Sequence, residues 1–282
     1  MLRVESATRL MSRWFTSILF FALLGLILGG LISIPLISKP NIAIITVSGE
    51  TLEQTYTNEI LDRLKEARDD SSIKGVVLQI DSPGGLVVAI EQIYLDVLRL
   101  RQQKPVVASI GARGVSGGYY IAVAANFIYA EPTSQLGSIG AWSSLPRPEE
   151  LDENILTTGP FKATGGSRRK VTDVLEMVRQ EFVSAVVTQR GDRLKMSDEE
   201  VSRAEIYVGA ESIRYGLIDG IGTRTTAIEK AASLAHIRNY AVKELNISKP
   251  YYFLVLGSSN MEDLKSQTSA MPIYYYLYFE TE

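Results

Sequence analysis

The feature that most constrains the fold is a pair of short apolar runs, each ending in a glycine-rich segment. Residues 73–80 (IKGVVLQI) lead into residues 81–85 (DSPGG), and residues 105–110 (PVVASI) lead into a predicted tight turn over residues 111–118. Continuous apolar runs of this length are typical of strands that are buried on both faces. Such strands occur in largely parallel sheets covered by helices, so the sequence predicts an α/β domain.

Weaker patterns indicate the other elements. Apolar spacing predicts strands at residues 41–48 and 127–130, and helices at residues 52–68, 86–100 and 119–126. Strand signals fade after residue 143, and the remaining pattern predicts helices at residues 171–190, 198–204, 207–222 and 225–236. We therefore expect a mostly parallel sheet followed by a helical C-terminal half.

A membrane anchor is predicted near the N-terminus. Residues 14–37 carry no charged side chain, and about 20 apolar residues suffice for a helix to cross a bilayer. The run is longer than the apolar region of a cleaved signal peptide and ends without an A-x-A pattern, which favours a retained single-pass helix. Arginines precede it at positions 3, 9 and 13, whereas Lys39 alone follows closely. The positive-inside rule then predicts an anchor in the cell membrane, a cytoplasmic N-terminus and an extracytoplasmic main domain.

Residue types that are absent or rare exclude several classes of protein. Without cysteine, the chain cannot be a cysteine protease or form thiolate metal sites or disulfides. Its single histidine, His236, excludes zinc sites built on two or three histidines of one chain. A net charge of −3 and the lack of a block rich in lysine and arginine give no indication of nucleic-acid binding. We expect no metal, no organic cofactor and no nucleic-acid partner.

Ser116 is the candidate nucleophile. It lies in residues 114–118 (GVSGG), between a predicted strand and a predicted helix, where a sharp turn can expose its hydroxyl. The alternative is a serine that only caps the helix, because serine is a favoured N-cap residue. The glycines of residues 81–85 also separate a strand from a helix. They indicate either an oxyanion hole made of free N–H groups or an ordinary strand–helix turn.

A serine hydroxyl needs a base, and the chain offers two candidates. A lysine can serve if burial in an apolar site lowers its pKa. Lys162 is a solitary charge in residues 159–166 (GPFKATGG), although most lysines are solvated surface residues. His236, near the end of a predicted helix, is the other candidate, although a structural histidine is its simpler interpretation.

Taken in order, these motifs resemble the signal peptide peptidase A family of membrane serine peptidases. That family shares its core fold with the Clp protease proteolytic subunit and the crotonases. The resemblance covers residues 41–239, and it rests on an ordered set of segments that is far more specific than any one of them. The segments are DSPGG (81–85), SGGYYIA (116–122), IYA (128–130), GSIG (137–140), GPFK (159–162) and YVGAESIRYGLIDGIG (207–222). Residues 166–172 depart from the family pattern and match it well only at Arg169 and Thr172.

The resemblance implies a serine endopeptidase that works through an acyl-enzyme and without a cofactor. The implied roles are nucleophile for Ser116, general base for Lys162, oxyanion hole for the backbone N–H groups of Gly85 and Gly117, and orientation of the lysine for Ser138. Members of the family assemble into homo-oligomeric rings, commonly octamers, in which the lysine can come from a neighbouring protomer. The implied substrates are residual signal peptides or other membrane-associated peptides in an extended conformation.

The predicted organisation has four parts. They are a short cytoplasmic N-terminus (1–13), the transmembrane anchor (14–37), the peptidase domain (41–240) and a C-terminal extension (241–282). The extension carries a tyrosine-rich run at residues 274–278 (YYYLY). This run is either an undocked end or a segment that docks on a groove, such as the active site of its own or a neighbouring subunit.

Other functions remain open from the residues alone. An α/β-hydrolase would use Ser116, Asp219 and His236 in the chain order of that fold, but it would need further strands after residue 143. A membrane-anchored peptide-binding scaffold would keep the fold without catalysis. A crotonase-like acyl-CoA enzyme is disfavoured, because an exported domain has no supply of CoA.

Overall fold

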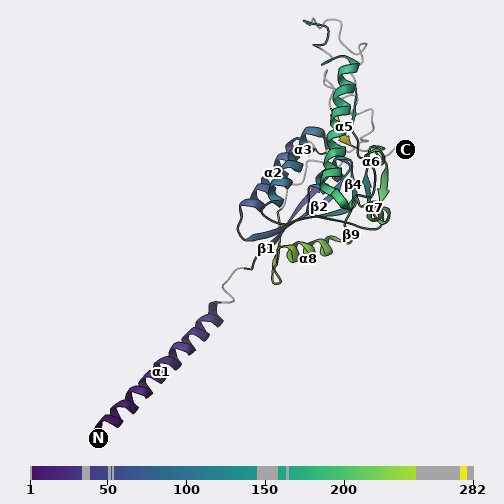
Figure 1. The fold of residues 1–282 in the computed structure, drawn as a ribbon. Helices are drawn as coiled ribbons and strands as arrows, with labels where there is room; N and C mark the ends of the chain where they lie inside the picture. Colours follow the sequence, from purple (N-terminus) through teal and green to yellow (C-terminus); the bar gives the residue numbers. More distant parts are fainter. Residues whose placement is uncertain are drawn as a thin grey trace. The chain divides into compact units, whose positions relative to one another are not determined.

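The computed structural model describes residues 2–33, 39–49, 52, 54–144, 158–162, 165–245 and 274–277. The chain divides into two compact units, Met1–Lys39 and Pro40–Glu282. The first unit contains helix α1 (Leu2–Ser33; Figure 1). Among the described residues, no helix is long and apolar enough to cross a membrane, so the structure does not support the predicted transmembrane helix. Residues 34–37 of that prediction, and most of the predicted C-terminal extension, lie outside the described residues.

The second unit is built on one main sheet, to which eight described strands belong. Their bounds are β1 Asn41–Ser48, β2 Ile73–Ser82, β4 Val106–Val115, β5 Phe127–Ala130, β6 Gln135–Gly137, β8 Ile206–Val208, β9 Gly220–Ile221 and β10 Ala241–Glu244. Six run in the order β10–β1–β2–β4–β5–β9, and all neighbours in this row are parallel. β6 pairs in parallel with the end of β4, and β8 pairs antiparallel with β6. The predicted α/β fold with a mostly parallel sheet is confirmed.

Helices cover both faces of this sheet, and α8 lies on the face opposite α2 and α3 (Figure 1). Alternate residues of each strand point to opposite faces. In β1, Ile42 and Ile44 join the core beneath α8, whereas Ala43 and Ile45 join the larger core on the other face. Strands that are buried on both faces need continuous apolar sequences, which explains the run Val76, Val77 and Leu78 in the middle of β2. The helices are α2 Gln54–Asp69, α3 Val87–Arg101, α4 Gly117–Val123, α5 Arg168–Arg190, α6 Asp198–Val201, α7 Gly209–Tyr215 and α8 Arg224–Leu234.

A second, smaller sheet lies at the C-terminal end of β2. It consists of β3 (Gly84–Leu86), β7 (Trp142–Ser143) and β11 (Tyr274–Leu277), in the order β3–β11–β7. β11 is antiparallel to both neighbours. On its other edge, β3 forms a parallel bridge with Leu52. This sheet therefore joins segments from the start, the middle and the end of the unit.

Two predicted elements differ from the structure. The predicted turn over residues 111–118 is mostly strand, because residues 113–115 of β4 pair with β6 and Gly114 also pairs with Ser82. The predicted helix over residues 207–222 is instead the end of β8, helix α7 and β9. Gly216 ends α7 with φ 73°, a left-handed conformation that glycine adopts without strain. The C-terminal half is therefore not wholly helical, since it adds short strands to the main sheet.

Candidate active site

Ser116 lies on a sharp turn between β4 and α4. Its backbone has φ 52° and ψ −121°, and such conformations cost a non-glycine residue about 1–3 kcal/mol. Ser116 occupies the N-cap position of α4, but its side chain makes no capping hydrogen bond. The interpretation as a capping serine therefore fails. The turn has instead the strained strand-to-helix geometry of a nucleophile elbow.

The DSPGG segment lies directly beside this turn. Ser82, at the end of β2, pairs with Gly114 of β4. A Cβ on Gly118 would lie 2.5 Å from the Ser82 carbonyl oxygen, so only glycine lets α4 begin this close to β2. The two glycine-rich motifs therefore meet at the carboxyl ends of neighbouring parallel strands, which is where open α/β sheets commonly bind ligands.

Gly85 presents its peptide group on the edge of β3 that faces away from Leu52. The Leu52 N–H donates to the Gly84 carbonyl at 2.9 Å, and the Leu86 N–H donates to the Leu52 carbonyl at 3.1 Å. Because successive peptide groups of a strand point to opposite edges, the N–H and C=O of Gly85 point the other way. The N–H of Gly117, the first residue of α4, has no acceptor within the helix. Both predicted oxyanion donors therefore belong to the two motifs that meet at this corner.

The GSIG segment accepts a hydrogen bond from the backbone of the candidate nucleophile. The Ser116 N–H donates to the Gly137 carbonyl at 2.7 Å. The next residue, Ser138, has φ 52°, and its N–H donates to the Glu205 carbonyl at 2.8 Å. Ser138 is therefore a backbone neighbour of the nucleophile, but within the described residues no hydrogen bond joins its side chain to Lys162.

Lys162 lies in a turn and is exposed, whereas the nucleophile is buried. Its backbone N–H donates to the Gly159 carbonyl at 3.4 Å. The preceding Phe161 is 51% exposed, whereas Ser116 is only 1% exposed. In the part of the chain that the structure describes, no hydrogen bond or ion pair joins Ser116 to Lys162. The single chain therefore gathers the other predicted site residues at one corner of the sheet and leaves the lysine at the surface.

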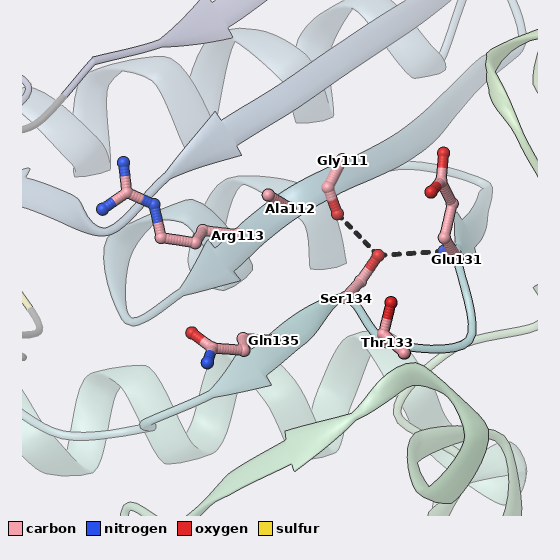
Figure 2. A pocket seen from close by; sticks show the side chains of 7 residues that line it. All are labelled: Gly111, Ala112, Arg113, Glu131, Thr133, Ser134 and Gln135. Atoms are coloured by element: carbon pink, nitrogen blue, oxygen red, sulfur yellow. Dashed lines mark hydrogen bonds between the residues drawn. The ribbon is translucent and has the colours of Figure 1, made fainter.

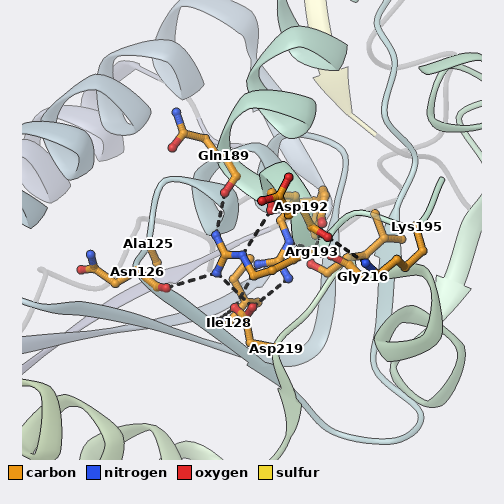
Figure 3. Close-up of polar contacts among 12 residues, drawn as sticks. Ala125, Asn126, Ile128, Gln189, Asp192, Arg193, Lys195, Gly216 and Asp219 are labelled. Atoms are coloured by element: carbon orange, nitrogen blue, oxygen red, sulfur yellow. Dashed lines mark hydrogen bonds and ion pairs between the residues drawn. The ribbon is translucent and has the colours of Figure 1, made fainter. Parts of the chain in front are cut away.

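Asp219 and His236 do not complete a triad with Ser116. Nη1 and Nη2 of the buried Arg190 donate to Oδ2 and Oδ1 of Asp219, both at 2.9 Å, and Nη1 of Arg193 adds a contact at 3.0 Å (Figure 3). His236 is exposed and follows α8, on the face of the sheet opposite α4. The acid is held in a structural ion pair and the histidine lies across the sheet, so the α/β-hydrolase arrangement is not assembled.

A cavity of about 530 Å³ lies beside β4, and neither Ser116 nor Lys162 lines it (Figure 2). Ser134 organises this region, because its Oγ donates to the Gly111 carbonyl at 2.5 Å and accepts from the Glu131 N–H at 2.9 Å. These hydrogen bonds connect β4 to the turn before β6, so Ser134 has a structural role. The lining residues are Gly111, Ala112, Arg113, Glu131, Thr133, Ser134 and Gln135.

Two residues that shape the site were not predicted as site residues. Leu52 forms two backbone hydrogen bonds with one edge of β3, and its side chain is fully buried. Gly137 supplies the carbonyl that holds the Ser116 backbone. Both act through the backbone, so their side-chain chemistry carries no signal. The position of Gly137 in the GSIG segment is the one sequence clue to its role.

Comparisons with known proteins agree with the motifs. The model of the Clp protease family matches residues 38–136, and that of peptidase family S49 matches residues 99–238. The putative protease slr0021 of Synechocystis sp. is 30% identical over 212 residues, which cover 70% of this chain and 76% of the relative. Protease 4 of Haemophilus influenzae is 28% identical over 216 residues, which cover 71% of this chain and 35% of the relative. The chain thus matches only about a third of the length of that protein.

Solved structures share the fold. A variant of the 1510-N membrane-bound stomatin-specific protease, in complex with a substrate peptide, matches with a TM-score of 0.51 at 18% identity. The match covers 76% of this chain and 95% of the other. At this identity the likeness shows the fold alone, and it agrees with the Clp protease-like core implied by the motifs. The family models and the 30% identical relative show that the chain belongs to peptidase family S49.

Proposed function

We propose that this chain is a serine endopeptidase that works through an acyl-enzyme, with Ser116 as nucleophile and Lys162 as base. The observation that carries the proposal is the strained turn at Ser116, whose side chain does not cap α4. Strained backbone persists where the surrounding structure enforces it, and such positions cluster at active sites. Membership of family S49 supports a serine peptidase.

In the proposed reaction, neutral Lys162 takes the proton of the Ser116 hydroxyl while Oγ attacks the scissile carbonyl. The N–H groups of Gly85 and Gly117 stabilise the oxyanion, and loss of one such donor commonly lowers the rate by about 10²–10³. The lysine ammonium then protonates the leaving amine. The same lysine activates a water molecule, which hydrolyses the acyl-enzyme.

Assembly into a homo-oligomeric ring, with eight subunits as the expected size, is part of this proposal. A lysine acts as a base only where its surroundings disfavour the ammonium form, and burial has this effect. Lys162 and Phe161 are both exposed in the single chain. A neighbouring subunit would either cover Lys162 or place its own lysine beside Ser116.

The test uses the full chain in detergent, with casein and a fluorogenic peptide as substrates. Ser116→Ala and Lys162→Ala are expected to lose at least about 10³-fold in kcat. The matched controls are Ser233→Ala and Lys170→Ala, which change exposed residues of α8 and α5 and should keep full activity. If Lys162→Ala still cuts, the lysine is not the base. If the folded and assembled wild type is inactive, the peptidase proposal fails and the peptide-binding scaffold becomes the favoured alternative.

Mixing the two inactive variants tests the origin of the lysine. Subunits of Ser116→Ala carry an intact Lys162, and subunits of Lys162→Ala carry an intact Ser116. If the lysine acts across a subunit interface, oligomers reassembled from both variants recover a substantial part of the wild-type activity. If it acts within one chain, the mixture stays inactive, and size-exclusion chromatography with light scattering shows whether mixed oligomers formed.

We also propose that residues 14–37 hold the chain in the cell membrane and that its substrates are residual signal peptides or other membrane-associated peptides. The support is the uncharged sequence and the exposure of large apolar side chains on α1, such as Trp14 at 69% and Leu26 at 79%. The arginines before this segment support a cytoplasmic N-terminus and an extracytoplasmic peptidase domain. Leu23→Arg combined with Leu26→Arg should release the chain from carbonate-washed membranes. Retention of this variant would contradict the anchor.

A further inference from the structure

Positive backbone φ in non-glycine residues is concentrated around the candidate nucleophile. Among the described residues, four non-glycine residues have φ between 52° and 57°: Ser116, Ser138, Ala204 and His236. The first three meet at the GSIG segment, whereas His236 follows α8 on the other face of the sheet. Such conformations cost energy in residues with a side chain, and they persist only where the surrounding structure enforces them. Three of them in one place therefore indicate one enforced unit.

A single peptide group connects the nucleophile to this unit. The carbonyl of Gly137 and the N–H of Ser138 belong to the same planar peptide group. Its carbonyl accepts from the Ser116 N–H at 2.7 Å, and its N–H donates to the Glu205 carbonyl at 2.8 Å. Because the group is rigid, it cannot rotate without weakening both hydrogen bonds. The Glu205 carbonyl therefore fixes the orientation of the acceptor that holds Ser116.

Both glycines of the GSIG segment face the turn that supplies this carbonyl, between α6 and β8. A Cβ on Gly137 would lie 2.6 Å from the Glu205 carbonyl oxygen, so a side chain there would displace the turn. A Cβ on Gly140 would lie 3.2 Å from the Cβ of Ala204, which is also a tight contact. Residues 204–205 therefore explain why the segment has glycine at both positions.

Ala204 directs the chain into this turn through its backbone. Its φ is 56°, and the residue is exposed, so the turn does not depend on burial of the side chain. Substitutions at exposed positions usually have small effects. Ala204 should differ, because a residue that cannot adopt positive φ would redirect the Glu205 carbonyl away from the GSIG segment.

We propose that residues 204–205 form a positioning turn for the proposed nucleophile. The left-handed backbone of Ala204 directs the Glu205 carbonyl to the peptide group of residues 137–138, and that group keeps Ser116 in its strained conformation. The effect on the reaction rate rests on the proposed peptidase function, whereas the coupling between the turn and Ser116 does not.

A positioning role has a distinct kinetic signature. Misplacing a reacting group by about 1 Å can lower the rate about 10²-fold. Because Ser116 acts in the chemical step, its displacement should lower kcat and leave KM unchanged. A purely structural role would instead lower the melting temperature and leave the kcat of the folded fraction unchanged.

The first experiment separates backbone conformation from side-chain size. Valine is β-branched and strongly disfavours positive φ, whereas asparagine tolerates it. We expect Ala204→Val to lower kcat for a fluorogenic peptide about 10–100-fold at unchanged KM, and Ala204→Asn and Ala204→Gly to keep wild-type values. His236→Val, which places the same strain at an exposed residue across the sheet, should keep kcat. Equal kcat values in Ala204→Val and Ala204→Asn would overturn the inference. Ala204→Leu, which lacks the β-branch, replaces the valine variant if that variant does not fold.

The second experiment needs no catalysis. Hydrogen exchange of the wild type, Ala204→Val and Ala204→Asn is followed by mass spectrometry on peptic fragments that contain residue 116 or residue 138. Weakening of the two hydrogen bonds should speed exchange of these amides at least about tenfold in Ala204→Val, whereas Ala204→Asn should match the wild type. If exchange separates the two variants while the wild-type enzyme cuts nothing, the peptidase proposal fails and the coupling stands. If the enzyme cuts but neither kcat nor exchange separates them, the inference about residues 204–205 alone fails.

Discussion

The backbone N–H of Ser116 donates to the Gly137 carbonyl at 2.7 Å, so a glycine of β6 holds the nucleophile that ends β4. Gly137 has φ 99°, and a Cβ there would lie 2.6 Å from the Glu205 carbonyl oxygen. The strained turn at Ser116 is therefore maintained by a neighbour that has no room for a side chain. This relationship explains how a conformation that costs stability can persist at the site.

Replacing Gly137 should thus damage catalysis, although β6 is only three residues long. We expect Gly137→Ala to lower kcat about 10–100-fold and the free energy of unfolding by about 1–3 kcal/mol, because the clash displaces the Ser116 turn. Gly191→Ala is the control, since Gly191 also has positive φ but has no atom within 4 Å of a Cβ. Steady-state kinetics and urea unfolding measure both effects. Retention of wild-type kcat in Gly137→Ala would show that this hydrogen bond does not position the nucleophile.

A similar pair of variants tests the oxyanion donor. A Cβ on Gly85 would overlap the Leu52 backbone, so Gly85→Ala should move β3 and lower kcat about 10²–10³-fold. At Gly111 the nearest atom to a Cβ is 3.5 Å away, which is an ordinary contact. Gly111→Ala should therefore keep wild-type activity. Equal kcat values in the two variants would show that the Gly85 N–H does not stabilise the oxyanion.

The Arg190–Asp219 pair should matter for stability and not for the chemical step. Both side chains are buried, and removing one partner of a buried pair typically costs about 3–5 kcal/mol. We expect Asp219→Ala to unfold at lower temperature by calorimetry while its folded fraction keeps kcat near wild type. His236→Ala, at an exposed position, should change neither quantity. A loss of kcat in both variants would instead support the Ser116–Asp219–His236 triad.

Glu91 should make stability depend on pH. Burial on α3 and the nearby charge of Glu181 raise the pKa of Glu91 above its ordinary value. A carboxyl with a raised folded pKa contributes stability that is fully present below its unfolded pKa and is lost as pH rises through the folded value. Glu91→Gln cannot ionise, so its melting temperature should exceed that of the wild type at about pH 7, and the two should converge near pH 4.

Glu176→Gln is the matched control with the opposite sign. The hydrogen bond from Arg179 lowers the pKa of Glu176 to about 2. A lowered folded pKa contributes stability that is present above the unfolded pKa and is lost as pH falls through the folded value. Glu176→Gln should therefore be slightly less stable than the wild type at neutral pH. A shift of the same sign in both variants would contradict the assigned causes.

The sequence predicted the elements whose patterns are local. The run at residues 73–80 has no charged residue after Lys74 and is mostly apolar because the middle of β2 is buried on both faces, and this indicates a central parallel strand. β8 and β9 have only three and two residues. They are too short to carry a periodic pattern, so residues 207–222 were predicted as one helix.

The residues by themselves indicated Ser116 and the glycines of residues 81–85 as candidates, and the family resemblance implied the roles of Gly85, Gly117 and Ser138. Only the tertiary structure shows that Ser116 has a strained backbone and does not cap α4. It also shows that Asp219 forms an ion pair with Arg190, and that residues 274–277 lie between β3 and β7. Each of these depends on contacts between groups far apart in the sequence, which only the folded chain brings together.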